Sequence, residues 1–234
     1  MKSRRFFRRV WQFNALVIAV AAILAIVLMC FVIFEVYKSA TRTRNASSIV
    51  NVDTSDMGDV EVNYRLGRTE YFSDNEIISF RLLMVQEYDF SYGSTKTTEN
   101  TVNYLFFDIN LRQNRWLLEG NDQLILQRTD LSNNPDARAE PIAAHLYTLV
   151  RNDTNGDGKL TAEDNQILAI ARADGSQFTE LFTDVATSPV TNSVGDGRAI
   201  ISFRDITGLL YIAEIDLSDF SITHKTAIDG ILPD

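Results

Sequence analysis

Oxygen-bearing side chains alternate along one short polar segment in the second half of the chain. Asp153, Asn155 and Asp157 occupy its positions 1, 3 and 5. Gly158 follows at position 6, and Asp164 stands at position 12. Calcium is a hard cation that takes six to eight oxygen ligands at about 2.3–2.6 Å, and a tight turn can gather alternate side chains around it. The spacing therefore predicts a Ca²⁺ site in this segment.

Residues 153–164 resemble the EF-hand-type calcium loop through the first nine positions and the dockerin-like variant at the end. The resemblance implies that Lys159 would bind through its main-chain carbonyl and Thr161 directly or through water. The EF-hand loop has Glu at position 12, whereas this chain has the shorter Asp, with Glu163 beside it as an alternative ligand. The predicted ligand set is Asp153, Asn155, Asp157, Lys159, Thr161 and Asp164.

Two placements of the calcium loop are open from the sequence. Helices flank an EF-hand loop, and residues 137–150 and 162–173 would have to supply them, although Pro141 weakens the first. The corresponding place in a later repeat is the short turn at residues 205–208, between two strands. We therefore expect the loop at the tip of a β-hairpin, where calcium would have a structural role.

A long apolar segment near the N-terminus predicts a membrane anchor. Residues 15–34 read ALVIAVAAILAIVLMCFVIF, and about 20 apolar residues span the roughly 30 Å hydrocarbon core. Five basic residues precede this run, while three basic residues and Glu35 follow it, which places the N-terminus in the cytosol. We expect a cytosolic segment at 1–14, a transmembrane helix in the lipid bilayer at 15–37 and a polar linker at 38–59.

Processing signals are the main alternative to a retained anchor. The apolar run is longer than the core of a secretory signal, and Lys38 stands where a cleavage site needs a small residue. A lipoprotein site at Cys30 would need small residues before it, but Leu28 and Met29 are there. Residues 3–8 resemble a twin-arginine motif, but a basic cluster of the positive-inside kind is the preferred interpretation. Cys30 is the single cysteine, so no intramolecular disulfide can form.

Charge divides the chain sharply. Residues 1–44 hold eight of the 22 basic residues and one of the 31 acidic residues, which leaves 14 basic and 30 acidic residues in the remainder, a formal net charge of −16. An acidic domain repels nucleic acid and anionic headgroups and attracts cations. We therefore exclude nucleic-acid binding.

From about residue 60 to residue 234 the pattern is that of β-strands separated by polar turns. Three similar stretches, 103–119, 166–183 and 208–226, each contain an apolar strand, a turn and a second strand, and each follows an earlier strand. The stretch Ile167–Ser176, with its Ala173-Asp174-Gly175 turn, resembles the repeat of TolB-type β-propellers. The expected fold is mainly β: an N-terminal transmembrane helix followed by an antiparallel β-repeat domain.

Three repeats are fewer than the four to eight blades that close a propeller. The resemblance therefore implies an open or partial propeller, or a ring that two or more chains complete. A small β-sandwich is the alternative, because any antiparallel protein contains hairpins of this kind.

No residue pattern in the chain predicts catalysis. Phosphate-binding glycine loops and nucleophile elbows are absent from the sequence. His145 and His224 are the only histidines, and each is expected at the surface or in packing. Trp116 is expected to fill the core between sheets, and most of the aromatic residues between 64 and 104 to pack there as well. One or two of them would be left to form a binding rim.

These features predict a single-pass, non-enzymatic protein of a bacterial inner membrane with a calcium-binding domain in the periplasm. It would act as an accessory or interaction subunit, and its partner would be another membrane protein or further copies of itself. Two alternatives stay open. One is a calcium-responsive sensor, and the other is a membrane-anchored hydrolase with its site in a propeller pocket.

Overall fold

A computed structural model of the chain shows two units: a helical unit, residues 1–45, and a β unit, residues 46–234. The residues that the structure describes are 2–41, 50–51, 62–72, 75–90, 94–133 and 141–228.

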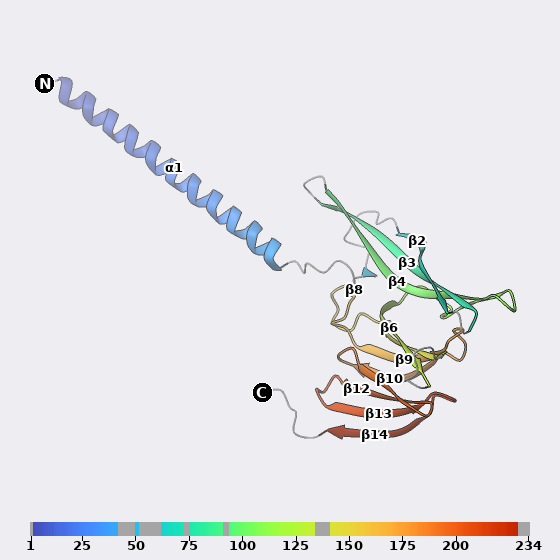
Figure 1. The fold of residues 1–234 in the computed structure, drawn as a ribbon. Helices are drawn as coiled ribbons and strands as arrows, with labels where there is room; N and C mark the ends of the chain where they lie inside the picture. The colour runs from blue at the N-terminus through green and yellow to red at the C-terminus, as the bar shows by residue number, and fades with distance from the viewer. Residues whose placement is uncertain are drawn as a thin grey trace. The chain divides into compact units, whose positions relative to one another are not determined.

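The helical unit is one α-helix, α1, from Lys2 to Thr41 (Figure 1). Neither glycine nor proline interrupts this stretch, so the backbone hydrogen bonds can continue on both sides of the apolar run. The part from Phe13 to Phe34 is long and apolar enough to cross a membrane, and none of it is buried against protein. The predicted 15–37 span thus lies inside a longer helix, which also takes in residues 38–41 of the predicted linker. Residues 42–49 and 52–59 of that linker are outside the described residues.

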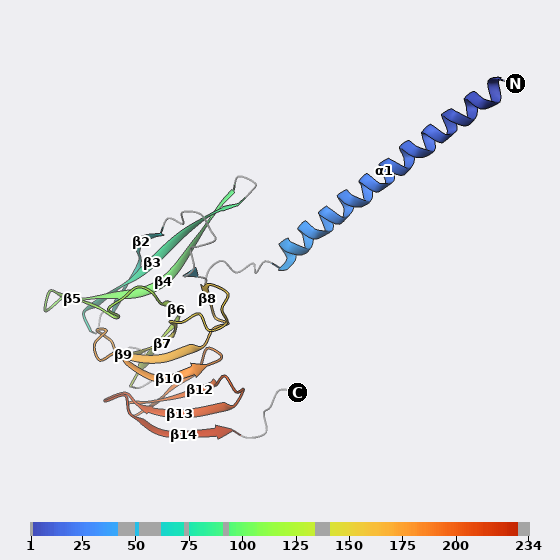
Figure 2. The same ribbon diagram turned by 180° about the vertical axis from the view of Figure 1, so that it is seen from behind.

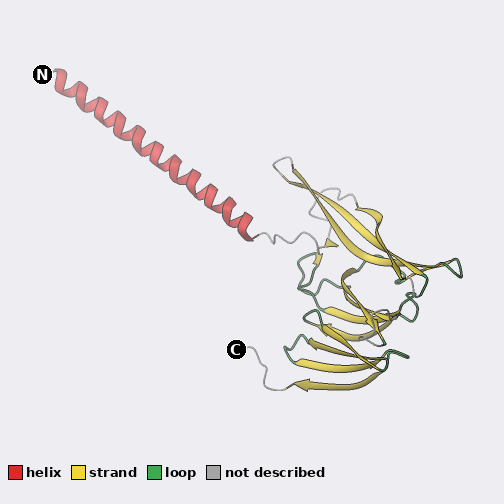
Figure 3. Ribbon diagram, in the orientation of Figure 1, coloured by secondary structure: helices red, strands yellow, loops and turns green. Residues whose placement is uncertain are grey.

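The β unit consists of antiparallel strands and the loops between them, with no helix in its described part (Figure 3). The strands are β1 Val50–Asn51, β2 Val62–Phe72, β3 Ile77–Phe90, β4 Ser94–Asp108, β5 Gln113–Trp116, β6 Leu124–Ser132, β7 Ile142–Val150, β8 Lys159–Leu160, β9 Gln166–Arg172, β10 Thr179–Val185, β11 Val190–Gly195, β12 Arg198–Arg204, β13 Leu210–Asp216 and β14 Ile222–Ile228.

Three four-stranded sheets account for all but the two shortest strands. Sheet 1 has the order β2-β3-β4-β5, sheet 2 the order β10-β9-β7-β6 and sheet 3 the order β11-β12-β13-β14. The sheets follow one another along the chain and stack face to face, with sheet 2 in the middle, and the three do not close into a ring (Figures 1 and 2). The mainly β, antiparallel prediction is therefore confirmed.

Sheet 2 is apolar on both faces because it lies between the other two sheets. On β7, Leu146 packs towards sheet 3, while Tyr147 and Leu149 pack towards sheet 1. On β9, Leu168 faces sheet 3 and Ala169 faces sheet 1. Successive strand residues point to opposite faces, so a strand buried on both sides reads as a nearly continuous apolar run. This explains the sequences of β7, IAAHLYTLV, and β9, QILAIAR.

Each of the three sequence repeats corresponds to the last two strands of one sheet. The stretch 103–119 contains the end of β4 and all of β5, 166–183 contains β9 and most of β10, and 208–226 contains β13 and most of β14. The earlier strands noted in the sequence are β3, β7 and β12, next to these pairs. The first strands β2, β6 and β11 complete the sheets, and the repeat pattern did not include them.

The position of Trp116 contradicts the expectation that it fills the core between sheets. Trp116 pairs with Leu105 of β4, whose neighbours Tyr104 and Phe106 face sheet 2. Because side chains alternate along a strand and directly paired residues share a face, Trp116 and Leu105 lie on the opposite, outer face of sheet 1. The Trp116 side chain is accordingly exposed (45%).

Candidate functional site

The predicted calcium loop connects two paired strands. β7 and β9 form an antiparallel pair with Leu149 opposite Ile167, and residues 153–164 lie in the connection between them. The expected hairpin placement is therefore confirmed. The flanking-helix alternative is wrong for 142–150 and 166–172, which are strands, and residues 137–140 are outside the described part of the chain.

Asp153 organises the first half of this loop. Its Oδ1 accepts hydrogen bonds from the amides of Gly156 at 2.7 Å and Asp157 at 3.2 Å. Its Oδ2 accepts from the amide of Gly158 at 2.7 Å. Gly158 has φ of +75°, a left-handed conformation that glycine adopts without strain and that lets the chain reverse at position 6. The turn that the motif predicts is thus present.

The next polar side chains repeat this arrangement along the loop. Asn155 Oδ1 accepts from the Asp157 amide at 2.9 Å, and Asp157 Oδ1 accepts from the Lys159 amide at 3.0 Å. These two contacts are Asx turns, which hold the oxygens of alternate residues along one bend. The Thr161 hydroxyl accepts from the Glu163 amide at 3.1 Å, so the Glu163 backbone closes a small turn there.

Asp164 closes the loop from its other end. It is almost fully buried (2% exposed). Its Oδ1 accepts from the Thr154 amide at 2.8 Å, and its Oδ2 accepts from the Thr161 amide at 2.9 Å. Asp164, at position 12, thereby connects position 2 with position 9 of the loop, although its side chain is shorter than the glutamate of the EF-hand motif.

The predicted ligand set of this loop fits a calcium ion, because each of its side-chain ligands offers an oxygen atom and Lys159 would offer its carbonyl oxygen. Each carboxylate oxygen has more than one acceptor site and can accept an amide and still face a cation. On the other hand, the described part of the chain has no group of three or more Asp, Glu, His or Cys side chains close enough to hold a metal. The loop has the turns and the oxygen-bearing side chains of the motif. Its aspartate carboxylates accept hydrogen bonds from backbone amides.

A short strand inside this loop pairs with the region that follows the helical unit. Leu160 of β8 lies opposite Val50 of β1, and Lys159 lies opposite Asn51. Val50 and Leu160 are 4% and 1% exposed, and both pack in the buried cluster that contains Val150. Leu160 does anchor the loop to the core, as its apolar position in the motif suggests. No sequence pattern predicts its partner β1, because two residues are too few to show a strand pattern.

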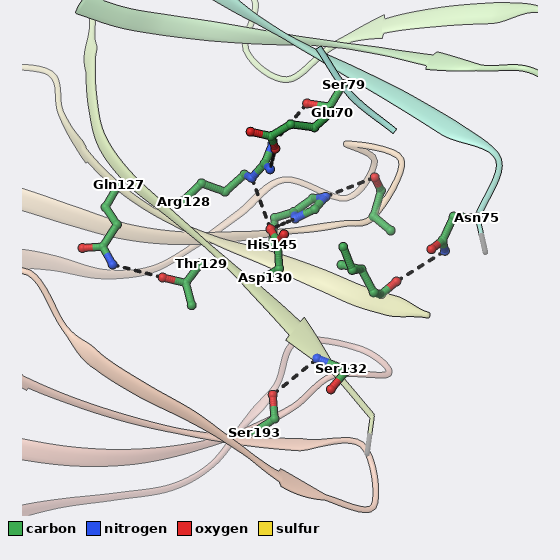
Figure 4. A network of polar contacts seen from close by, with 12 residues as sticks. Glu70, Asn75, Ser79, Gln127, Arg128, Thr129, Asp130, Ser132, His145 and Ser193 are labelled. Atoms are coloured by element: carbon green, nitrogen blue, oxygen red, sulfur yellow. Dashed lines mark hydrogen bonds and ion pairs between the residues drawn. The ribbon is translucent and has the colours of Figure 1, made fainter. Parts of the chain in front are cut away.

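A second polar cluster lies between sheet 1 and sheet 2 (Figure 4). Arg128 of β6 forms ion pairs with Glu70 of β2 and with Asp130 of its own strand, and it donates to the Ser79 hydroxyl of β3 at 3.1 Å. Its side chain is only 8% exposed, and its guanidinium carbon is 5.0 Å from the ring centre of Tyr104. This arginine thus joins the two sheets by charge as well as by packing.

The acidic members of the cluster are held in their ionised form. Burial raises the pKa of Asp130, but the hydrogen bond from His145 and the charge of Arg128 outweigh it, so the pKa lies below its ordinary value. Burial likewise raises the pKa of Glu70, and Arg81 and Arg128 together lower it further than burial raises it. Both carboxylates therefore stabilise the folded state at neutral pH.

His145 is fully buried among aromatic rings between the two sheets. Nδ1 lies 2.7 Å from Asp130 Oδ1, and Nε2 lies 3.3 Å from the carbonyl oxygen of Ala173. The ring also stacks on Phe106, with 5.8 Å between the ring centres. Both ring nitrogens therefore face acceptor oxygens within the protein.

Two cavities open between the sheets. The larger, about 650 Å³, lies beside β2, β3 and β6 and is lined by three arginines and a glutamate, namely Arg65, Arg68, Arg81 and Glu99, together with leucine side chains. The smaller, about 420 Å³, lies between β10 and sheet 3. It contains the ammonium of Lys225, whose Nζ is 4.3 Å from the Tyr211 ring centre and 5.1 Å from that of Phe182. The lining of the smaller cavity also includes two aspartates, Asp184 and Asp205.

Comparisons of this chain with protein-family models, with curated protein sequences and with solved structures find no match. The likeness to TolB-type propellers and to EF-hand or dockerin loops therefore stays a prediction from the residues.

Proposed function

We propose that this chain is a single-pass membrane protein whose β unit lies outside the cytosol, binds calcium in the loop at 153–164 and acts as a non-enzymatic interaction subunit. The observation that carries the proposal is the turn in which Asp153, Asn155 and Asp157 present alternate oxygens, with Gly158 at the bend. This is the order of groups that a calcium loop requires.

The anchor part of the proposal follows from α1. Its apolar stretch is exposed on all sides, and such a surface is stable in lipid and costly in water. The basic residues before it favour an N-terminus in the cytosol. The β unit would then lie on the far side, and we assign it to the periplasm of a bacterial inner membrane because the chain lacks disulfides and its best repeat is of a bacterial type.

Calcium would have a structural role here: it would stabilise the folded β unit. The loop joins β7 to β9, both central strands of sheet 2, and β8 within the loop holds β1. An ion that binds only the folded loop stabilises the fold by RT ln(1 + [Ca²⁺]/Kd). Extracellular calcium modules bind at about 10⁻⁴–10⁻³ M, which gives about 1.4–2.7 kcal/mol at 10 mM calcium.

The test is a calcium titration of the full chain in detergent micelles. We expect binding heat in the millimolar range or below and a rise in Tm of several degrees at 10 mM Ca²⁺. Asp157→Ala should remove both effects, because it deletes a ligand, while the loop loses the hydrogen bond from the Lys159 amide.

Asp205→Ala is the matched control. Asp205 forms the Asx turn in the corresponding connection of sheet 3, where it accepts from the amides of Thr207 at 2.9 Å and Leu209 at 3.0 Å, in a turn of only a few residues. This variant should be less stable but should keep the calcium response. No heat and no change in Tm up to 10 mM calcium in the unmodified chain would refute the calcium site.

One observation favours the sensor as a second candidate function. The β1–β8 pairing connects the loop to the residues that follow the helical unit, so an ion in the loop could change the order of that segment. A calcium-dependent change in partner affinity, and not only in Tm, would support the sensor over the structural role.

A further inference from the structure

The outer face of sheet 1 carries two rows of side chains that belong to none of the buried clusters of the described structure. β-Sheet register aligns Thr69, Phe80, Leu105 and Trp116 across the four strands in one row, and Tyr71, Ile78, Phe107 and Asn114 in the next. We call the six apolar members the outer patch: Tyr71, Ile78, Phe80, Leu105, Phe107 and Trp116.

At this end of sheet 1, the alternation of the strands places the patch opposite the residues that face sheet 2. Further along β3, Leu82 and Met84 are buried in another cluster. Ile77, Tyr104 and Phe106 are buried against sheet 2. Their neighbours Ile78 and Leu105 therefore point the other way, are partly exposed, and belong to none of the buried clusters. Tyr71 and Trp116, at the two edges of the sheet, are 59% and 45% exposed.

Charge is absent from both rows, although the β unit has a strongly acidic composition. The outer face of sheet 3, at the other end of the stack, differs. There Arg198 donates to Glu214 at 3.1 Å, and these two residues alternate with the inward-facing Ala199 and Ile215. A contact between the outer patch and sheet 3 of another copy would bury that ion pair against apolar side chains, which is costly.

We propose that the outer patch is the core of a symmetric interface between two copies of this chain. Two outer patches can meet without bringing like charges together, while most other surfaces of two acidic units repel. In a two-fold contact the same patch serves both copies, so Tyr71 and Trp116 of each copy lie in the contact.

This inference names the partner within the proposed function and rests on its anchored, interacting role. Two copies inserted in the same direction in one membrane are related by an axis along the membrane normal, which is the symmetry that such a contact needs. The shared membrane also raises their effective concentration. Aromatic side chains at the centre of an apolar patch are the groups that usually dominate such interfaces.

The test compares Tyr71→Glu and Trp116→Glu with Val190→Glu. All three side chains are exposed in edge strands, but Val190 (66%) lies on sheet 3. Sedimentation of the full chain in mild detergent should give a dimer for the unmodified chain and for Val190→Glu. The two patch variants should be monomers, with Kd for self-association raised at least tenfold and far-UV circular dichroism unchanged.

A second readout avoids the effect of detergent on an apolar surface. Energy transfer between copies tagged at the C-terminus, in native membranes, should fall to background for Trp116→Glu and persist for Val190→Glu. A monomer in both assays for the unmodified chain would overturn the proposal. Loss of a different, captured protein from the Trp116→Glu variant, with no self-association, would assign the patch to that partner and also overturn it. The calcium response should be the same in all three variants, so a failure of the interface and a failure of the calcium site can be distinguished.

Discussion

At the residue scale, one glycine allows sheet 1 and sheet 2 to approach each other closely. Gly175, in the β9–β10 turn, has φ of +78°, and a Cβ there would lie 2.8 Å or less from ring atoms of Phe106 in sheet 1. Gly208, in the β12–β13 connection, has φ of +87° but has nothing within 4 Å of a Cβ. The glycine of the Ala-Asp-Gly turn is therefore needed for two reasons, backbone conformation and contact between sheets.

The two glycines predict different costs for the same substitution. Gly208→Ala should lower the free energy of unfolding by about 1 kcal/mol, the cost of a left-handed alanine. Gly175→Ala should lower it by about 2–4 kcal/mol, since the overlap with Phe106 adds to that cost. Urea denaturation followed by far-UV circular dichroism measures both values. An equal decrease in the free energy of unfolding of the two variants would show that the Phe106 ring can move away from the new Cβ without destabilising the protein.

At the scale of elements, the predicted calcium loop contains one of the two shortest described strands and pairs through it with the other. β1 has two residues, and its partner β8 lies at positions 7 and 8 of the loop. Such a short strand has little stability of its own and depends on the burial of Val50 beside Leu160. Because coupling between two events is reciprocal, calcium should hold β1 in place and β1 should strengthen calcium binding.

Val50→Asp should therefore weaken calcium binding by about tenfold, within the usual range of coupling free energies. The carboxylate would be buried without a partner at this position, and β1 would leave β8. Val190→Asp, at an exposed site on β11, is the control and should bind calcium as the unmodified chain does. Isothermal titration of both variants checks this, and an unchanged Kd in Val50→Asp would show that β1 and the loop act independently.

At the scale of the whole β unit, an ionic network crosses the junction of two sheets. Glu70 comes from sheet 1, Arg128 and Asp130 come from sheet 2, and His145 lies buried behind them. Breaking a buried pair leaves a charge without a partner, which is more costly than never having had the pair. The network thus favours one arrangement of the two sheets over others.

Acid should weaken this junction. The pKa of Asp130 is lower in the folded state than in the unfolded chain, so its contribution is complete above the unfolded value of about 3.9 and disappears as the pH falls through the folded value. Asp130→Asn should destabilise the protein at pH 7, and the difference from the unmodified chain should shrink as the pH drops below about 4. Urea denaturation at several pH values measures this difference.

Asp196→Asn is the control, because the Asp196 side chain is 93% exposed, 3.9 Å from Arg198. It should match the unmodified chain at every pH. A difference for Asp130→Asn that stays constant down to pH 3 would show that the network does not depend on the charge of this carboxylate.

The amino-acid sequence alone determined the local features of this protein. A continuous apolar run needs no partner to form a helix, so α1 and its central span were predictable, although its ends were not. The alternate oxygens and the glycine at position 6 specified the turns of the loop, since those contacts join residues a few positions apart. The repeated strand pairs predicted antiparallel sheets for the same reason.

Only the tertiary structure decided which face of each strand is buried and which distant segments contact each other. Trp116 looks like a core residue, and its place on the outer face follows from its register with Leu105, which no local pattern reveals. The apolar run of β3 shows that both of its faces avoid water, but not which of them the protein itself covers. The β1–β8 pair and the Arg128–Glu70 ion pair join residues 58 or more positions apart, and their formation depends on the stacking of whole sheets.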